Sequence, residues 1–311
     1  MTPFCAAVDW GTSSFRLWLL SGDGAALAER RSDEGMIRAA AIGFEGILER
    51  HLAELGVAAD LPVIVCGMAG ARQGWREAGY LDTPANLAEI VRSATTVAGI
   101  ARDVRILPGI AQRDASAPDV MRGEETQLLG LVADGVGSAL VCMPGTHSKW
   151  VTLDGGRVAG FSTYMTGEIF DVLSRHSILS AAVGGAPEIL PDDPAFLDAA
   201  ASALANPAMV SNLLFQLRAG QLLGFKPAAE GAARLSGTLI GLELAGAMAR
   251  HGPVGEVVLV ASGSLGSLYR GILEARGLTV RVRDANEAVR HGLWSAAREF
   301  WGGKGSGNHG R

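Results

Sequence analysis

A short polar turn between two strand-like segments occurs twice in this chain, and it constrains the fold more than any other feature. The first turn, at residues 10–14, follows an apolar run at 4–9 and leads into a second apolar run. The other, at 144–148, follows a run at 138–143 and again leads into a strand-like segment. Each arrangement is typical of a β-hairpin. A single doubly wound domain would not need two such hairpins, so we expect an α/β protein with two halves built on one plan.

The remaining patterns fit a β-β-β-α-β-α-β plan in each half, because apolar residues at helical spacing alternate with short strand-like runs. The further strands are expected at 15–21, 25–32, 61–66, 104–107, 149–153, 157–163, 256–261 and 279–282. The helices are expected at 44–55, 86–98, 118–135, 167–179, 194–224 with a break near Pro207, 237–250, 265–276 and 286–301. We predict an N-terminal lobe at 1–112, a C-terminal lobe at 113–301 and a disordered Gly-rich tail at 302–311. The two lobes are expected to face a cleft.

Composition and charge argue against several classes of protein. The net charge of -5 provides no broad cationic field for nucleic acid. The least charged stretch, 199–217, contains polar residues throughout, so no membrane span is expected. No charged and then apolar leader follows Met1, which favours a cytoplasmic protein. Cys5, Cys66 and Cys142 lie in apolar runs without a CxxC pair, so they are expected to be buried thiols and neither a disulfide framework nor a zinc site.

The residues of the first turn suit a triphosphate. Phosphate oxygens need backbone N–H donors at close range, small residues that permit the approach, and hydroxyl groups. Gly11, Thr12, Ser13 and Ser14 supply these, and Asp9 at the end of the preceding strand is placed to hold Mg²⁺ directly or through water. Taken alone, such a turn is more often an ordinary hairpin with an exposed acid.

The second turn changes that balance, because two such turns at the starts of similar halves rarely arise by chance. Gly145, Thr146, Ser148 and Lys149 are its candidate phosphate ligands. His147 is a possible base, but no carboxylate near it in sequence would orient it, so packing or a phosphate contact is preferred.

A third element follows the strand expected at 256–261. Gly263, Ser264 and Leu265 begin a helix directly after it, which suits the close approach of a nucleotide to a helix N-terminus. The chain has no GxxxxGK[ST] motif between a strand and a helix, so a P-loop is excluded.

A phosphoryl acceptor also needs a carboxylate that orients or deprotonates its hydroxyl group. Glu124 and Glu125 are the candidates, and they follow Arg122 and Gly123 at an expected helix start. The competing interpretation is a pair of solvated acids favoured by the helix dipole.

Six sequence blocks together resemble the 2-dehydro-3-deoxygalactonokinase family. The blocks are VDWGTSSFR at 8–16, GMAGARQGW at 67–75, MRGEETQ at 121–127, PGTHSKW at 144–150, MTGE at 165–168 and HSIL at 176–179. The resemblance extends from residue 8 to about residue 300, and blocks of this length are more specific than a single glycine motif.

The resemblance implies a member of the sugar kinase, Hsp70 and actin superfamily, with two ribonuclease-H-like lobes and ATP in the cleft between them. It further implies Mg²⁺ as a cofactor and phosphorylation of the 6-hydroxyl of 2-dehydro-3-deoxy-D-galactonate. The turns at Asp9 and Gly145 would match the two phosphate motifs, and residues 262–266 the adenosine motif. Sugar kinases of this superfamily often use an Asp as the base, whereas this chain has Glu124 and Glu125 near the comparable place.

The implied substrate is a carboxylate, which favours an arginine fork in its site. Arg72 and Arg76 are the first candidates, while Arg16 and Arg175 are also considered. The full set of predicted substrate contacts is Arg72, Gln73, Trp75, Arg76, Arg122 and Glu168.

Three alternatives stay open at this point. One is an exopolyphosphatase-like hydrolase, whose Gly-x-Glu-Glu pattern resembles Gly123 to Glu125; another is a kinase for a different keto-deoxy sugar acid on the same fold. The third is an ATP-gated chaperone or filament subunit, although only ten residues follow residue 301. The expected partner is a small sugar acid, without nucleic acid or membrane, and a homo-oligomer is possible.

Overall fold

The computed structural model describes residues 2–183, 188–252 and 254–304. The chain forms two compact units. The first consists of Met1–Ser138, Leu153–Gly160 and Ala285–Arg311, and the second of Ala139–Thr152 and Phe161–Asp284. This division differs from the boundary predicted at residue 112, because the chain stays in the first unit up to Ser138 and its C-terminal helix belongs to that unit.

A six-stranded sheet forms the centre of the first unit, with the order β3-β2-β1-β4-β8-β7. β1 pairs antiparallel with β2 and parallel with β4, so the first polar turn closes the hairpin at the carboxyl end of β1. The strands are β1 (Cys5–Trp10), β2 (Phe15–Leu20), β3 (Ala26–Ser32), β4 (Val63–Gly67), β7 (Thr95–Thr96) and β8 (Val104–Ile106).

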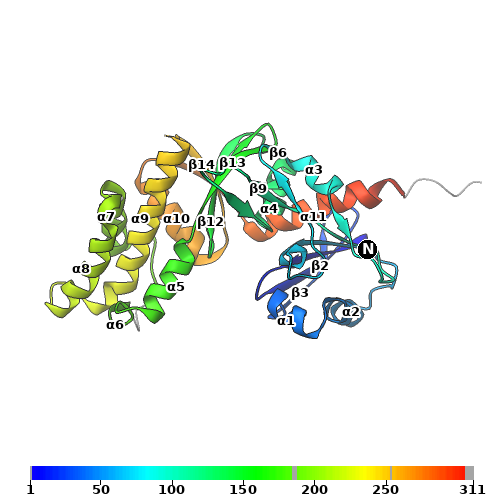
Figure 1. Ribbon diagram of the computed structural model, residues 1–311, viewed down its shortest axis with the longest axis horizontal. Helices are drawn as coiled ribbons and strands as arrows, with labels where there is room; N and C mark the ends of the chain where they lie inside the picture. The colour runs from blue at the N-terminus through cyan, green and yellow to red at the C-terminus, as the bar shows by residue number, and fades with distance from the viewer. Residues whose placement is uncertain (1, 184–187, 253, 305–311) are drawn as a thin grey trace, which may run out of the picture. The chain divides into compact units, whose positions relative to one another are not determined.

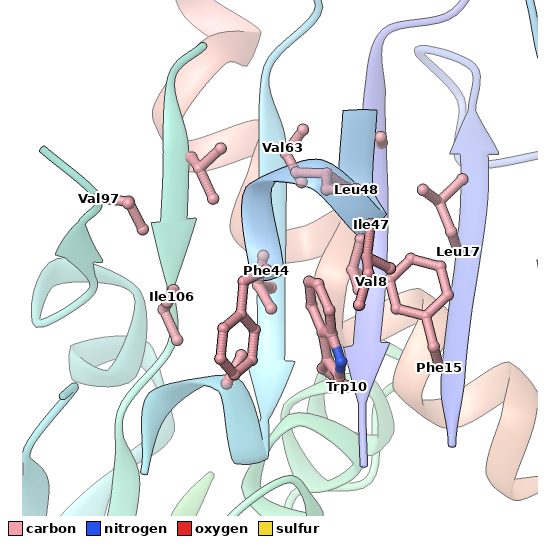
Figure 2. Packing of buried hydrophobic residues seen from close by; sticks show 14 of the residues in the cluster. Val8, Trp10, Phe15, Leu17, Phe44, Ile47, Leu48, Val63, Val97 and Ile106 are labelled. Carbon is pink, nitrogen blue, oxygen red and sulfur yellow. The ribbon is translucent and has the colours of Figure 1, made fainter. Parts of the chain in front are cut away.

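Aromatic side chains fill the core on one face of this sheet. Figure 2 shows Trp10 between Phe15 and Phe44, with ring centroids 4.7 and 5.0 Å from the Trp10 ring. Phe44 begins helix α2 (Phe44–Glu54), which covers this face. The Trp10 indole N–H donates to the Glu34 carbonyl at 2.9 Å, so the strand end that carries Asp9 is held by packing and by a hydrogen bond.

Two helices pack on each other against the other face. α11 (Ala285–Trp301) contacts β1 and β4, and α4 (Glu124–Ala133) packs along α11. Glycine permits this close approach, because a Cβ atom on Gly130 would lie 2.0 Å from the Ala288 carbonyl oxygen and one on Gly292 would lie 1.9 Å from that of Thr126.

Smaller elements complete the first unit, among them a three-stranded sheet with the order β10-β9-β5. The first residues of β13 also belong to this unit and pair with β6, with Arg157 opposite Asn86. These elements are α1 (Met36–Ile42), η1 (Met68–Gly70), β5 (Tyr80–Asp82), β6 (Ala85–Asn86), α3 (Leu87–Arg92), β9 (Gly109–Gln112), β10 (Asp119–Met121) and η4 (Gly302–Lys304).

The second unit repeats the hairpin arrangement, with strands in the order β15-β14-β11-β12-β13. β11 pairs parallel with β14, and β14 pairs parallel with β15. The strands are β11 (Ala139–Met143), β12 (Ser148–Asp154), β13 (Arg157–Tyr164), β14 (Glu256–Val260) and β15 (Thr279–Arg283).

The longest helix of the second unit, α9 (Gly231–His251), lies beside α7 and α8 (Figure 1). Gly237 and Gly241 of α9 bring it against α7, where a Cβ atom would lie within 2.4 Å of the carbonyl oxygens of Phe196 and Ala200. The other helices are α5 (Thr166–His176), α6 (Ser180–Val183), α7 (Pro194–Ala205), η2 (Pro207–Met209), α8 (Val210–Leu222), η3 (Ala228–Glu230) and α10 (Gly263–Ala275). In the described part of the chain, no helix has both the length and the apolar character needed to cross a membrane.

Both hairpins and the break at Pro207 are confirmed, and the three cysteines are buried free thiols as predicted. The single helix predicted at 118–135 is wrong. Residues 119–121 pair with β9, and Gly123 at φ +110 separates that strand from α4, a backbone conformation that a helix cannot contain. The helix predicted at 86–98 ends at Arg92, because the β-branched Thr95 and Thr96 pair with β8. Of the tail predicted at 302–311, residues 302–304 form the 3-10 turn η4, and 305–311 lie outside the described residues.

Candidate functional site

The first polar turn is held by a segment that the sequence analysis did not single out. The Gly11 N–H donates to the Ser14 carbonyl at 2.8 Å, and the Met36 N–H donates to the Gly11 carbonyl at 2.9 Å. Gly35 lies directly against the backbone of Ser13, where a Cβ atom would be only 2.5 Å away. The hydroxyl groups of Thr12, Ser13 and Ser14 are left on the surface. A rigid backbone turn with exposed hydroxyl groups is the arrangement that phosphate binding requires.

Asp9 and Glu124 come together in the first unit although 115 positions separate them in the sequence. Burial raises the pKa of Asp9 above its usual value of 3.8; the Arg16 guanidinium opposes this shift, and the Glu124 carboxylate adds to it. The Cys66 thiol donates weakly to Asp9, with Sγ and Oδ1 3.8 Å apart. A buried acid beside a second acid favours a bound cation, which offsets both the burial of the charge and the repulsion between the two carboxylates.

The two glutamates at the start of α4 have different surroundings. Glu125 is fully buried, and its carboxylate accepts the Gly123 N–H at 2.6 Å and the Thr126 hydroxyl at 3.1 Å. Burial, reinforced by the Glu124 charge, raises the pKa of Glu125 to about 8. Glu124 is partly exposed and accepts the Arg122 N–H at 3.1 Å. Glu125 therefore holds the turn before α4, and Glu124 is the one of the pair that a substrate can reach.

The donor set around Asp9 suits a hard cation with few protein ligands. Among the described residues, no cluster of three or more His, Cys, Asp or Glu side chains could hold a metal. A cation here would depend on Asp9, with Glu124 close by, and on water or substrate oxygens. Mg²⁺ is commonly bound in this way, through one or two carboxylates and substrate phosphates.

The loop at 71–77 carries most of the predicted substrate residues, and their exposure differs. Arg72, Gln73 and Arg76 are exposed, and Arg72 makes only a loose 3.7 Å pair with Glu77. Trp75 is instead half-buried and packs against the core, because its ring stacks on Phe44 at 5.9 Å.

Arg122 is directed at the backbone of its own unit. It donates to the Ala78 carbonyl at 2.7 Å, and its guanidinium lies over the Tyr80 ring at 4.4 Å. These contacts fix the backbone just before β5, where the predicted substrate loop ends. Arg122 therefore holds the end of that loop in place.

The second polar turn is buttressed by the start of α5. A Cβ atom on Gly167 would lie 2.6 Å from the Gly145 carbonyl oxygen, and the Glu168 N–H donates to the Thr146 carbonyl at 3.0 Å. Glu168, which was predicted to contact the substrate, lies beside His147, with Oε2 2.5 Å from Nε2. The orienting carboxylate that the sequence did not reveal near His147 therefore comes from α5.

Ser148 and Lys149 are placed differently from Thr146 and His147. Ser148 is fully buried and bonds to the Tyr269 hydroxyl at 2.9 Å, and its Oγ accepts the Gly145 N–H at 3.4 Å. Lys149 is 4 % exposed, and its ammonium donates to the His147 carbonyl at 3.3 Å. Thr146 and His147 are exposed. The buried pair stabilises the turn, and the exposed pair is the part that a ligand can contact.

The second turn and the predicted adenosine segment line one cavity of about 180 Å³ in the second unit. Gly145 borders it from the turn, and Ser264 and Leu265 border it from the first turn of α10. Gly263, at φ +72, begins that helix. The other lining residues were not predicted from the sequence, and they come from α5, α9, α10 and the segment before α7; they include Thr166, Ile189, Ser236, Leu239, Ile240 and Tyr269.

Comparison with known proteins decides the family. The profile described as 2-keto-3-deoxy-galactonokinase matches residues 9–296. The chain belongs to this family. A relative from Rhizobium meliloti named probable 2-dehydro-3-deoxygalactonokinase is 62% identical over 299 residues, which cover 96% of this chain and 98% of that protein. The 2-dehydro-3-deoxygalactonokinase of Escherichia coli is 34% identical, again over 96% of this chain and 98% of the relative.

Solved structures agree with membership of the galactonokinase family. The crystal structure of a candidate 2-dehydro-3-deoxygalactonokinase from Sinorhizobium meliloti superposes with a TM-score of 0.93 at 62% identity, covering 96% of this chain and 99% of that one. The activator of 2-hydroxyisocaproyl-CoA dehydratase from Clostridium difficile, with bound ADPNP, has a TM-score of 0.53 at 13% identity and covers 99% of each chain. This second likeness concerns the mixed α/β fold alone.

Proposed function

We propose that this chain is an ATP-dependent kinase that phosphorylates the 6-hydroxyl of 2-dehydro-3-deoxy-D-galactonate. The observation that carries the proposal is the match to the galactonokinase family over nearly the whole chain, with a relative of that name at 62% identity. The two polar turns support it, because each unit holds one rigid turn with exposed backbone and side-chain groups suited to phosphate oxygens.

The polar turn of each unit is proposed to bind phosphate oxygens of ATP. The adenosine would enter the cavity beside Ser264 and Leu265, whose apolar walls suit a purine ring. In the second turn, Thr146 and His147 are the proposed phosphate contacts, since Ser148 and Lys149 are buried behind it.

Mg²⁺ is the proposed metal, held by Asp9 with Glu124 close by. When bound, it would neutralise negative charge on the phosphate oxygens. Asp9 fits this role because burial and the adjacent Glu124 charge already disfavour its ionised form in the absence of a cation.

Glu124 is proposed to accept a hydrogen bond from the 6-hydroxyl and thereby aim it at the γ-phosphate. Transfer of this kind has a loose transition state, so positioning and charge stabilisation contribute more than strong base catalysis. Glu125 would keep Glu124 in place by holding the Gly123 backbone. The exposed Arg72 and Arg76 would bind the substrate carboxylate, which matches the planar guanidinium fork.

A coupled assay of ADP release with a panel of 2-keto-3-deoxy sugar acids tests this function. The expected result is ATP consumption that depends on the acid and is fastest with the galactonate-derived epimer. Equal consumption without any acid would instead indicate a hydrolase, and preference for the gluconate-derived epimer would identify a kinase for a different acid. Identification of the phosphorylated carbon by ³¹P–¹H NMR completes the test.

A further inference from the structure

Glu243, on the long helix α9, is a buried carboxylate beside the cavity of the second unit. Its side chain is 1 % exposed and accepts hydrogen bonds from the Trp150 indole at 2.8 Å, from the Tyr269 hydroxyl at 2.6 Å and from the Thr166 hydroxyl. These donors are neutral groups. Burial raises the pKa of Glu243, and the hydrogen bonds oppose that shift by stabilising the ionised form.

The three donors come from the segments that surround the predicted nucleotide site in the second unit. Trp150 lies in β12 directly after the second turn, and Thr166 begins α5, next to the glycine that packs on the turn. Tyr269 lies on α10, and together with Thr166 it lines the cavity assigned to adenosine. One carboxylate therefore connects β12, α5 and α10.

A carboxylate in this position also fixes the direction of the hydrogen bonds. The Tyr269 hydroxyl donates its proton to Glu243 Oε2. The Tyr269 oxygen can then only accept from Ser148, which lies 2.9 Å away. The Ser148 oxygen in turn accepts a hydrogen bond from the Gly145 N–H at 3.4 Å. The chain of bonds thus runs from the turn to Glu243 through Ser148 and Tyr269.

We propose that Glu243 is a positioning residue for the nucleotide. Through Tyr269, Ser148 and Thr166, it fixes the position of the second phosphate turn relative to the adenosine cavity. The inference rests on the proposed kinase function and adds a group that does not touch ATP. A well-packed apolar side chain often replaces a buried charge at no loss of stability. What an apolar side chain could not do here is orient three hydroxyl groups and an indole around one site.

Glu243→Gln and Tyr269→Phe test this directly. Glutamine keeps the shape of the Glu243 side chain, but its NH₂ group faces a hydrogen-bond donor, either the Tyr269 hydroxyl or the Trp150 indole. Phenylalanine keeps the ring of residue 269 in the cavity but removes the hydroxyl that links Ser148 to Glu243. We expect each variant to raise the KM for ATP about tenfold, which matches the loss of one or two buried hydrogen bonds. The KM for the sugar acid should stay within about twofold, and the double variant should be no worse than the poorer single variant because the residues act in one network.

Leu235→Ala is the matched control. Leu235 is a fully buried residue on the same helix, and it packs in a separate apolar cluster with Leu217 and Leu179. It should lower Tm without a selective rise in the KM for ATP. ATP binding by calorimetry, alongside Tm, distinguishes positioning from a general loss of stability.

Two results would overturn the inference. One is an unchanged KM for ATP in Tyr269→Phe, which tests the network even if Glu243→Gln does not fold. The other is a rise in the KM for ATP that is as large in Leu235→Ala as in Glu243→Gln. In both cases wild-type ATP binding would leave the proposed kinase function intact. A wild-type protein that does not bind ATP would contradict the kinase function itself, and the role of Glu243 with it.

Discussion

His147 Nε2 lies 2.5 Å from Glu168 Oε2, although 21 positions separate the two residues in the sequence. Helix α5 makes this contact possible, because Gly167 packs directly on the Gly145 carbonyl and brings the next residue over the turn. Both side chains remain nearly half exposed, at 48 % and 43 %. Glu168 therefore orients the imidazole on the surface of the second turn, where a phosphate can reach it.

We expect His147→Ala and Glu168→Gln both to weaken ATP binding. An exposed contact of this kind contributes at most about 1 kcal/mol, so the KM for ATP should rise roughly two- to fivefold with little change in kcat. Steady-state kinetics with each substrate varied in turn measures this. His176→Ala, at the exposed end of the same helix, is the control. A loss of more than about 100-fold in kcat would instead identify His147 as the catalytic base.

Glu124→Gln should retain ATP affinity and lose turnover by about 10²–10⁴-fold, the usual contribution of a general base. The amide keeps the shape of the side chain but cannot take up a proton. Calorimetric titration with ATP and the coupled assay give the two quantities. Near wild-type turnover would remove Glu124 from the reaction and leave Glu125 or another group as the base.

Glu125 should make folding stability depend on pH in a defined window. Its pKa rises from 4.5 to about 8 in the folded protein, so between these values the folded state keeps a proton that the unfolded state has released. The contribution of Glu125 to the free energy of unfolding is thus fully present below pH 4.5. It is lost as the pH rises toward 8, by up to about 1.4 kcal/mol per pH unit.

Urea unfolding of the wild type and of Glu125→Gln at pH 5 and pH 8 tests this dependence. Glutamine does not titrate, so the variant should gain stability relative to the wild type as the pH rises. A stability difference that stays constant across this range would show that Glu125 has an ordinary pKa.

Arg72→Ala should raise the KM for the sugar acid by about tenfold or more and leave the KM for ATP nearly unchanged. The reason is that a charge-assisted contact to a carboxylate is lost while both phosphate turns are untouched. Arg113→Ala provides a comparison, since Arg113 is also exposed in the same unit but pairs with Asp82. Equal KM values for the acid in the wild type and Arg72→Ala would exclude Arg72 from the substrate site.

Gly167→Ala should displace the second turn, because the new methyl group would lie 2.6 Å from the Gly145 carbonyl oxygen. We expect a higher KM for ATP and a lower Tm. In Gly46→Ala the added methyl group on helix α2 meets no atom within 4 Å, so that variant should be neutral or more stable. A variant Gly167→Ala with normal ATP kinetics would show that the turn tolerates the shift.

The sequence by itself determined the local structure and the chemistry of the turns. Apolar runs on either side of a short polar turn predicted both hairpins, and Pro207 predicted the broken helix, because strand runs, turns and proline geometry are properties of neighbouring residues. The family blocks indicated the kinase. Only the tertiary structure placed Glu168 at His147, buried Ser148 and Lys149 behind their turn, and gathered three donors around Glu243. Those relationships depend on how helices pack on the sheets, and no periodic pattern in the chain records which distant side chains then meet.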